Sequence, residues 1–173
     1  EMSLDMVRPG IMLYGLYPSQ DVNKKTVDLR QVMELKTRVS HVKLLPPGRG
    51  VSYGLKYRTN EERKIITIPI GYADGFTRML TEKAEIIVKG KKIPVVGRIC
   101  MDQCMADATG LDINLGDEVT IYSSDPQSHN TIEDVAAKLG TINYEIICMV
   151  GKRVTRAYVE NNNLINIYDY LLR

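Results

Sequence analysis

Two glycine-bounded motifs could present tyrosine hydroxyl groups to a ligand. In GRGVSYG, residues 48–54, three glycines lie around Tyr53. Glycine allows positive φ, so this loop either forms a simple turn or presents the tyrosine. The spacing does not match G-x-G-x-x-G and no helix is expected to follow, which argues against a dinucleotide site. IGYADG, residues 70–75, follows an apolar segment, and loops after strands often carry functional side chains. Taken alone, each motif is also typical of an ordinary turn.

Two further motifs combine charge with apolar or glycine-containing sequence. RICMDQCMADA, residues 98–108, places Asp102 in a run predicted to be a strand. If that run is half-buried, Asp102 either faces solvent or needs a cationic partner, for which Arg98 is a candidate. Arg8-Pro9-Gly10 joins a cation to backbone amides that glycine leaves free. This arrangement suits an anion such as phosphate, although the same turn is common.

The side chains available favour proton transfer by tyrosine close to arginine. Together these motifs contain no Ser-His-Asp set, no paired carboxylates at short spacing and no metal-binding cluster. Its cysteines, Cys100, Cys104 and Cys148, are odd in number and lack C-x-x-C spacing, and there are only two histidines. We therefore expect no bound metal and no disulfide framework, and we predict a reducing compartment.

Composition narrows the functional class further. The chain has 173 residues and a net charge of +2, with acidic and basic residues mixed along it. This pattern gives no basic patch for nucleic acid. No apolar run approaches the roughly 20 residues needed to cross a membrane, and the first residues do not resemble a secretory signal. We expect a cytoplasmic protein that binds neither nucleic acid nor membrane.

Short strands separated by turns must position these motifs. The pattern of β-branched and apolar residues predicts a mainly β domain, an antiparallel barrel or sandwich with one or two short helices. The predicted strands are 35–45, 64–70, 84–88, 93–97, 98–108, 115–122 and 152–160. Glycine in KGKK predicts a hairpin between the third and fourth of them. The tail from 161 to 173 has no clear assignment.

One helix has distinct start and stop signals. Thr131 is a hydroxyl N-cap, Asp134 lies at the third helical position, and Gly140 is placed to end the helix. NYEIICMVG, residues 143–151, is a candidate second helix. Residues 6–17 do not fit the β domain, because their apolar run is broken at Arg8-Pro9-Gly10 and is typical of an interrupted buried strand.

Taken together, the motifs resemble the bacterial alanine racemases. VRPGIMLYG, VSYG, IPIGYADG, VGRICMDQCM and TINYE occur in that family's order and approximate spacing, from about Met6 to about Arg156. The resemblance implies a fold-type III pyridoxal-phosphate enzyme, with an N-terminal (β/α)8 barrel and a mostly β C-terminal domain. It further implies that residues 1–17 end the barrel, 18–34 form a linker and 35–173 form the C-terminal domain. The family's Schiff-base lysine would then lie outside this chain.

The same resemblance assigns roles to individual residues. Tyr53 matches the catalytic tyrosine, the acid or base at one face of the substrate Cα, with the missing lysine at the other face. Because tyrosine has an ordinary pKa of ~10, such a base needs cations nearby. Four residues match cofactor contacts: Arg8 at the pyridine nitrogen, Gly10 and Ile11 as backbone donors to the phosphate, and Tyr144 as a further phosphate contact. Met101 matches a substrate-binding position that acts through its backbone, with Asp102 beside it. Tyr72 and Arg78 match residues that line the entrance or support the tyrosine.

The implied activity is interconversion of L- and D-alanine, an isomerase reaction that supplies D-alanine for peptidoglycan. In the family the tyrosine acts in the partner subunit's site, so a homodimer is expected and this chain alone should be inactive. Related serine racemases share these motifs, and a barrel-fold pyridoxal-phosphate decarboxylase is a further alternative. A non-catalytic β-barrel binding module is a distant one, because it would need a basic face with interleaved aromatic residues.

Overall fold

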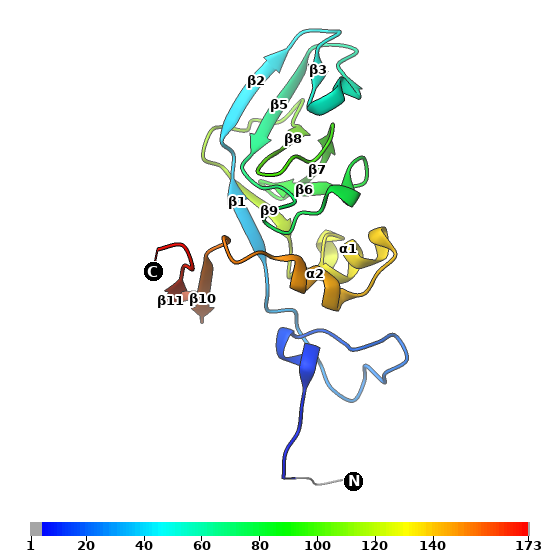
Figure 1. Ribbon diagram of the computed structural model, residues 1–173, viewed down its shortest axis with the longest axis vertical. Coiled ribbons are helices and arrows are strands. Elements are labelled where there is room, and N and C mark those ends of the chain that lie inside the picture. Colours follow the sequence, from blue (N-terminus) through cyan, green and yellow to red (C-terminus); the bar gives the residue numbers. More distant parts are fainter. Residues whose placement is uncertain (1–4, 173) are drawn as a thin grey trace.

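A curled antiparallel sheet forms the centre of the computed structural model, which describes residues 5–172 (Figure 1). Its seven strands lie in the order β1-β9-β6-β7-β8-β5-β2. Their bounds are β1 Leu35–Arg38, β2 His41–Leu45, β5 Arg63–Ile68, β6 Glu85–Val88, β7 Lys91–Val96, β8 Cys104–Asp107 and β9 Glu118–Tyr122. The predicted mainly β fold is confirmed.

The sheet curls because one run of chain contributes both of its edges. β1 and β2 are consecutive in sequence yet lie at opposite ends of the strand order. Between them, Val39 N–H donates to the Asp117 carbonyl and Ser40 N–H donates to the Thr67 carbonyl, each at 2.9 Å. The chain therefore leaves one edge and joins the other within two residues, which bends the sheet into a half-barrel.

The inside of the curl is filled by aliphatic side chains. In β6 and β9 the buried positions alternate with more exposed ones, as expected for strands with one face on a core. The fully buried side chains of this core include Ile66, Ile68, Ile86, Val88, Val119, Ile121 and Tyr122. Tyr122 also packs edge-on against Phe76 and donates its hydroxyl to the Gly75 carbonyl at 3.1 Å.

Two short helices, both expected from the sequence, lie at one end of the sheet (Figure 1). α1 spans Ile132–Leu139 and α2 spans Asn143–Met149. Thr131 and Asp134 form the expected capping box, and Gly140 ends α1 with a φ of 72°. The apolar face of α1 enters the core through Ile132, Val135 and Ala136, which are all buried.

The predicted strand over 98–108 is half wrong. Only Cys104–Asp107 joins the sheet, as β8, and residues 98–103 form a loop. The carbonyls of Cys100 and Met101 instead accept hydrogen bonds from the Tyr72 and Ala73 amides, each at 3.1 Å. The loop after β5 thus forms hydrogen bonds with two carbonyls that would otherwise be available to a neighbouring strand.

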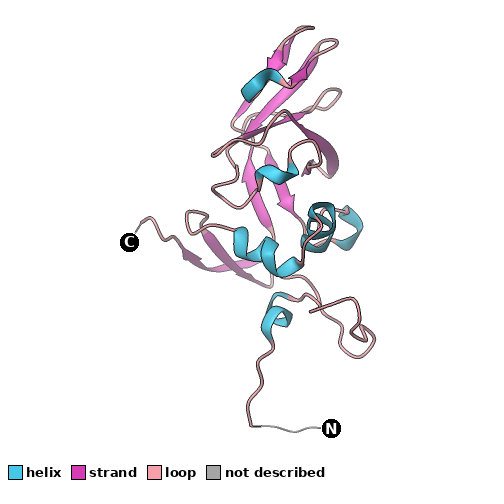
Figure 2. Ribbon diagram, turned by 45° about the vertical axis from the view of Figure 1, so that its right-hand side comes forward, coloured by secondary structure: helices cyan, strands magenta, loops and turns pink. Residues whose placement is uncertain are grey.

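The two ends of the chain extend from the sheet (Figures 1 and 2). Within residues 5–17 the only regular element is a 3-10 helix, Gly10–Tyr14, so the structure shows no strand there. Residues 1–4 lie outside the described part, and the division at residues 17 and 34 stays a prediction. At the other end, β10 Arg156–Glu160 and β11 Asn163–Tyr168 form a hairpin, which gives the unassigned tail a strand.

The remaining elements are short. β3, Gly50–Val51, pairs with β4, Tyr57–Arg58, and further 3-10 turns cover Tyr53–Leu55, Arg78–Leu80 and Pro126–Ser128. Among residues 5–172, no helix combines the length and apolar character required to cross a lipid bilayer.

Candidate active site

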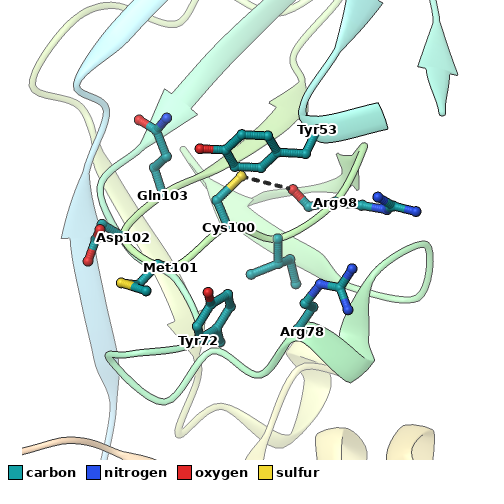
Figure 3. A pocket seen from close by; sticks show the side chains of 9 residues that line it. Tyr53, Tyr72, Arg78, Arg98, Cys100, Met101, Asp102 and Gln103 are labelled. Carbon is teal, nitrogen blue, oxygen red and sulfur yellow. Dashed lines mark hydrogen bonds between the residues drawn. The ribbon is translucent and has the colours of Figure 1, made fainter. Parts of the chain in front are cut away.

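Three loops surround a cavity of about 700 Å³ on one side of the sheet (Figure 3). They are the turn between β3 and β4, the loop after β5 and the loop before β8. The structure brings five of the predicted site residues to this cavity: Tyr53, Tyr72, Arg78, Met101 and Asp102. It adds Arg98, Cys100 and Gln103, which the sequence did not single out as site residues.

A strained and tightly held turn presents Tyr53. Tyr53 is 74% exposed, so it is not packed against the other described residues. The preceding residue, Ser52, has a φ of 65°, which is uncommon for a residue with a side chain. The Ser52 hydroxyl donates to the Arg98 carbonyl at 2.7 Å, and this bond fastens the turn to the loop before β8. Backbone strain held by surrounding contacts is characteristic of functional sites.

Two arginine side chains place positive charge on one side of the cavity. Figure 3 shows Arg78 and Arg98 on the side opposite Asp102. A Cβ added to Gly54 would lie 3.0 Å from Arg98 Nη1, so this glycine allows the guanidinium to approach the turn that carries Tyr53. The two arginines can attract an anionic ligand and can stabilise negative charge on a neighbouring oxygen.

Free backbone donors lie in the loop before β8. Cys100 N–H donates to the Gln103 carbonyl at 2.9 Å, which closes the loop. Within residues 5–172, neither Met101 N–H nor Asp102 N–H has an acceptor. Adjacent unpaired amides suit a carboxylate or another small anion. The structure therefore supplies a donor at the residue expected to act through its backbone.

Asp102 has a partner that the sequence did not indicate. The expected candidate was Arg98, but Arg153 Nη2 lies 2.5 Å from Asp102 Oδ1. The same guanidinium binds Asp74 Oδ1 through Nε at 2.6 Å. The two carboxylates, first Asp74 and then Asp102, raise the pKa of Arg153 and keep it charged. Arg153 and Asp102 are separated by 51 positions in the sequence, which explains why no local pattern reveals the pair.

The cysteines near the cavity are free thiols. Burial, together with nearby Cys100, raises the pKa of Cys104 to about 12, so Cys104 is not a reactive thiolate at neutral pH. Within residues 5–172, no group of three or more histidine, cysteine or acidic side chains could hold a metal ion.

The four predicted cofactor residues do not line this cavity. Pro9 has right-handed helical φ and ψ, and Gly10 follows with a φ of 59°. This succession turns consecutive amides toward one point, and Gly10 N–H and Ile11 N–H have no acceptor within residues 5–172. The pair of amides fits a phosphate.

Tyr144 and Arg8 are available to the same kind of ligand. Tyr144 is 37% exposed in the first turn of α2, and Arg8 is exposed. Asn143 donates to the Tyr17 carbonyl at 2.9 Å, which ties the start of α2 to the N-terminal segment. The described residues thus offer two separate groups of candidate site residues.

Comparison with known proteins identifies the family. The model for "Alanine racemase, C-terminal domain" matches residues 32–158. The chain belongs to the alanine racemase family. The resemblance inferred from the sequence motifs is therefore confirmed.

Individual alanine racemases match this chain over most of its length. That of Clostridium novyi is 49% identical over 173 residues, which cover 99% of this chain and 45% of the relative. That of Desulfovibrio desulfuricans is 55% identical over 161 residues, which cover 92% of this chain and 42% of the relative. The chain thus spans less than half the length of these curated alanine racemases.

Solved alanine racemases share the fold. The Clostridium difficile 630 alanine racemase in complex with cycloserine has a TM-score of 0.87 and 50% identity, and the match covers 94% of this chain and 42% of that one. The Bacillus anthracis alanine racemase with bound L-Ala-P has a TM-score of 0.87 and 38% identity, with the same two coverages. The curled sheet and its helices are therefore an alanine racemase architecture.

Proposed function

We propose that this chain is the C-terminal part of a pyridoxal-phosphate-dependent alanine racemase that interconverts L- and D-alanine and supplies D-alanine for peptidoglycan. The main support is the presentation of Tyr53, 74% exposed on a strained turn, beside a cavity with two arginines and free backbone amides. A structural tyrosine would be expected to pack or to hydrogen-bond locally. The exposed Tyr53 is instead available to a reactant outside the described residues.

Tyr53 would transfer a proton at one face of the substrate Cα. Racemisation removes a proton from one face and returns one to the other, so two groups must flank this carbon. Arg78 and Arg98 place positive charge in the same cavity, and such charge stabilises a tyrosinate. The free N–H of Met101 would bind the substrate carboxylate and orient Cα toward the hydroxyl. The second group is the lysine that the family carries in its barrel.

The residues expected at the cofactor fit its phosphate. Gly10 N–H and Ile11 N–H would donate to it, the Tyr144 hydroxyl would contact it, and Arg8 would lie at the pyridine nitrogen. When bound, pyridoxal phosphate withdraws electrons and acidifies the substrate Cα–H. Because a guanidinium in general is not readily deprotonated, an arginine at this position would leave the ring less electron-withdrawing than an acidic partner would.

The separation of the two groups supports a homodimer. Arg8, Gly10, Ile11 and Tyr144 do not line the cavity that holds Tyr53. If both groups serve the same reaction, the simplest arrangement gives each chain half of two sites. Tyr53 would then act in the partner subunit's site, while the Gly10 and Ile11 amides would bind the cofactor of their own subunit.

The decisive test is Tyr53→Phe in the complete enzyme. We expect loss of proton exchange at one face of Cα, measured by deuterium incorporation into each alanine enantiomer in D2O. Tyr158→Phe is a matched control, because that tyrosine lies in the β10–β11 hairpin and is 52% exposed. Unchanged exchange at both faces in the Tyr53 variant would contradict the assignment.

The substrate and the reaction can be separated in the same assay. The Met101 amide recognises a carboxylate, which alanine and serine share, so rates should be compared for both amino acids. Carbon dioxide release in place of racemisation would indicate a decarboxylase. Turnover of alanine by the 173-residue chain with added pyridoxal phosphate would contradict the proposed division of the site.

A further inference from the structure

Arg153 connects two loops of the cavity without lining it. Its Nε binds Asp74, in the loop that carries Tyr72, and its Nη2 binds Asp102, which directly follows Met101. Neither the sequence motifs nor the cavity lining singles out this arginine. Its position nevertheless places one cation between the two loops that shape the substrate end of the cavity.

The Asp74 side of this contact is partly buried and fixed by hydrogen bonds. The Asp74 side chain is only 13% exposed, and its Oδ2 accepts the Gly71 amide at 2.8 Å. Gly151 N–H donates to the Asp74 carbonyl at 3.1 Å, so the segment after α2 is also fixed to this loop. Arg153 is therefore held in place by Asp74, and its second nitrogen is directed at Asp102. A planar guanidinium can hold two carboxylates in this way, which a lysine ammonium does less well.

The negative charge of Asp102 would oppose the binding of an anion at the neighbouring amides. The free amides of Met101 and Asp102 suit a carboxylate, but the Asp102 side chain is itself a carboxylate one residue from Met101. A substrate carboxylate at the Met101 amide would be repelled by the Asp102 carboxylate, and this repulsion increases when water is excluded. The Asp102 side chain is 63% exposed, and among the described residues Arg153 is the cation that forms an ion pair with it.

We propose that Arg153 is a positioning residue that neutralises Asp102 and thereby allows the Met101 N–H to donate to the substrate carboxylate. This role rests on the proposed racemase function. Arg153 touches neither the substrate nor the cofactor. It acts through Asp102 and sets the affinity for the carboxylate, while proton transfer stays with Tyr53.

The test uses the complete enzyme with substitutions that separate charge from structure. Arg153→Gln retains a donor for Asp74 but removes the charge. We expect its KM for alanine to rise about tenfold, with kcat changed less than about threefold, since only substrate binding is affected. Adding Asp102→Asn to this variant removes the unbalanced charge and should return KM to within about threefold of the unsubstituted enzyme.

Two further variants exclude a purely structural role. Arg153→Lys keeps the charge, so its KM should change less than about threefold. Arg30→Gln removes an arginine from an exposed pair with Asp28 and should leave KM unchanged. A KM that is unaffected in Arg153→Gln, or that does not recover in the double variant, would overturn the proposal. If Arg153→Gln fails to fold, a tenfold higher KM in Arg153→Lys would overturn it as well.

A binding measurement separates this proposal from the proposed function. Calorimetric titration with acetate reports carboxylate affinity without turnover, and we expect about tenfold weaker binding in Arg153→Gln. If the unsubstituted enzyme does not racemise alanine but shows this dependence, the racemase proposal fails and the role of Arg153 stands. Equal acetate affinity in both proteins would refute the role of Arg153 alone.

Discussion

The cavity loops and the helix-covered end of the sheet are held together by different kinds of contact. At the helical end, Thr131 and Asp134 cap α1 within four residues of sequence. At the cavity, the main contacts join distant parts of the chain: Ser52 binds the Arg98 carbonyl, and Arg153 binds Asp102. The helical end follows favourable local rules, whereas the cavity departs from them at Ser52. This contrast is expected when one region provides stability and the other provides a site.

The largest effect is expected where two cavity loops touch backbone to backbone. A Cβ on Gly71 would lie 2.2 Å from the Cys100 carbonyl oxygen and 2.4 Å from that of Met101. Gly71→Ala should therefore displace the loop before β8 and lower the free energy of unfolding by about 3 kcal/mol, measured by chemical denaturation.

Gly110→Ala is the control for this substitution. Its Cβ would meet nothing within 4 Å, so only its φ of 79° is unfavourable and the loss should be near 1 kcal/mol. Equal losses in the two variants would show that close approach of the loops does not matter.

A buried amide at the helical end should have the next largest effect. Asn130 is 1% exposed, and its Nδ2 donates to the Ile121 carbonyl at 2.7 Å and to the Glu85 carbonyl at 3.1 Å. Asn130→Ala should lower the free energy of unfolding by about 2 kcal/mol, because two carbonyls lose a donor. The exposed Asn163→Ala should cost much less, and a similar cost would contradict this account.

The helix cap should contribute less. Thr131→Ala removes the side-chain acceptor for the Asp134 amide and should cost about 1 kcal/mol, measured by thermal or chemical denaturation. Thr131→Ser keeps the oxygen and should restore most of the loss. If serine and alanine behaved alike, the cap would not be the cause. Folded Thr131→Ala protein should keep the cavity intact, since the hydrogen bonds of Thr131 within the described residues go to Asp134 and Val135.

The smallest effect concerns pH and the attachment of α1 to the sheet. Glu85 Oε2 lies 3.0 Å from Lys138 Nζ in α1 and 3.3 Å from Lys92 Nζ in β7. Partial burial opposes ionisation of Glu85, but Lys138 and then Lys92 outweigh it and lower its pKa. A lowered pKa in the folded state adds stability above the unfolded value of 4.5 and loses it as pH falls through the folded value.

Glu85→Gln should accordingly reduce the dependence of the melting temperature on pH below about pH 5. The difference should correspond to at most about 1 kcal/mol, because solvent screens this partly exposed group. Identical acid sensitivity of Glu85→Gln and the unsubstituted protein would contradict a role for this ion pair.

The helix, the hairpin between β6 and β7 and the central strands were predictable from the sequence. Their signals are local: a capping box around Thr131, a glycine at position 90 and β-branched runs such as that in β5. The loop at residues 98–103 was not predictable. Its composition resembles a strand, but its carbonyls accept hydrogen bonds from the loop after β5. The ion pair between Asp102 and Arg153 was also missed, because the two residues are far apart in sequence.

The sequence by itself determined the family, the mainly β architecture and the candidate residues, since periodicity, caps and motifs are properties of short stretches. Only the tertiary structure decided that Tyr53, Arg98 and Met101 share one cavity while Gly10 and Tyr144 do not. Only it could show that Arg153 balances Asp102. These outcomes depend on how the sheet curls and which loops meet, and such long-range contacts leave no periodic trace in the chain.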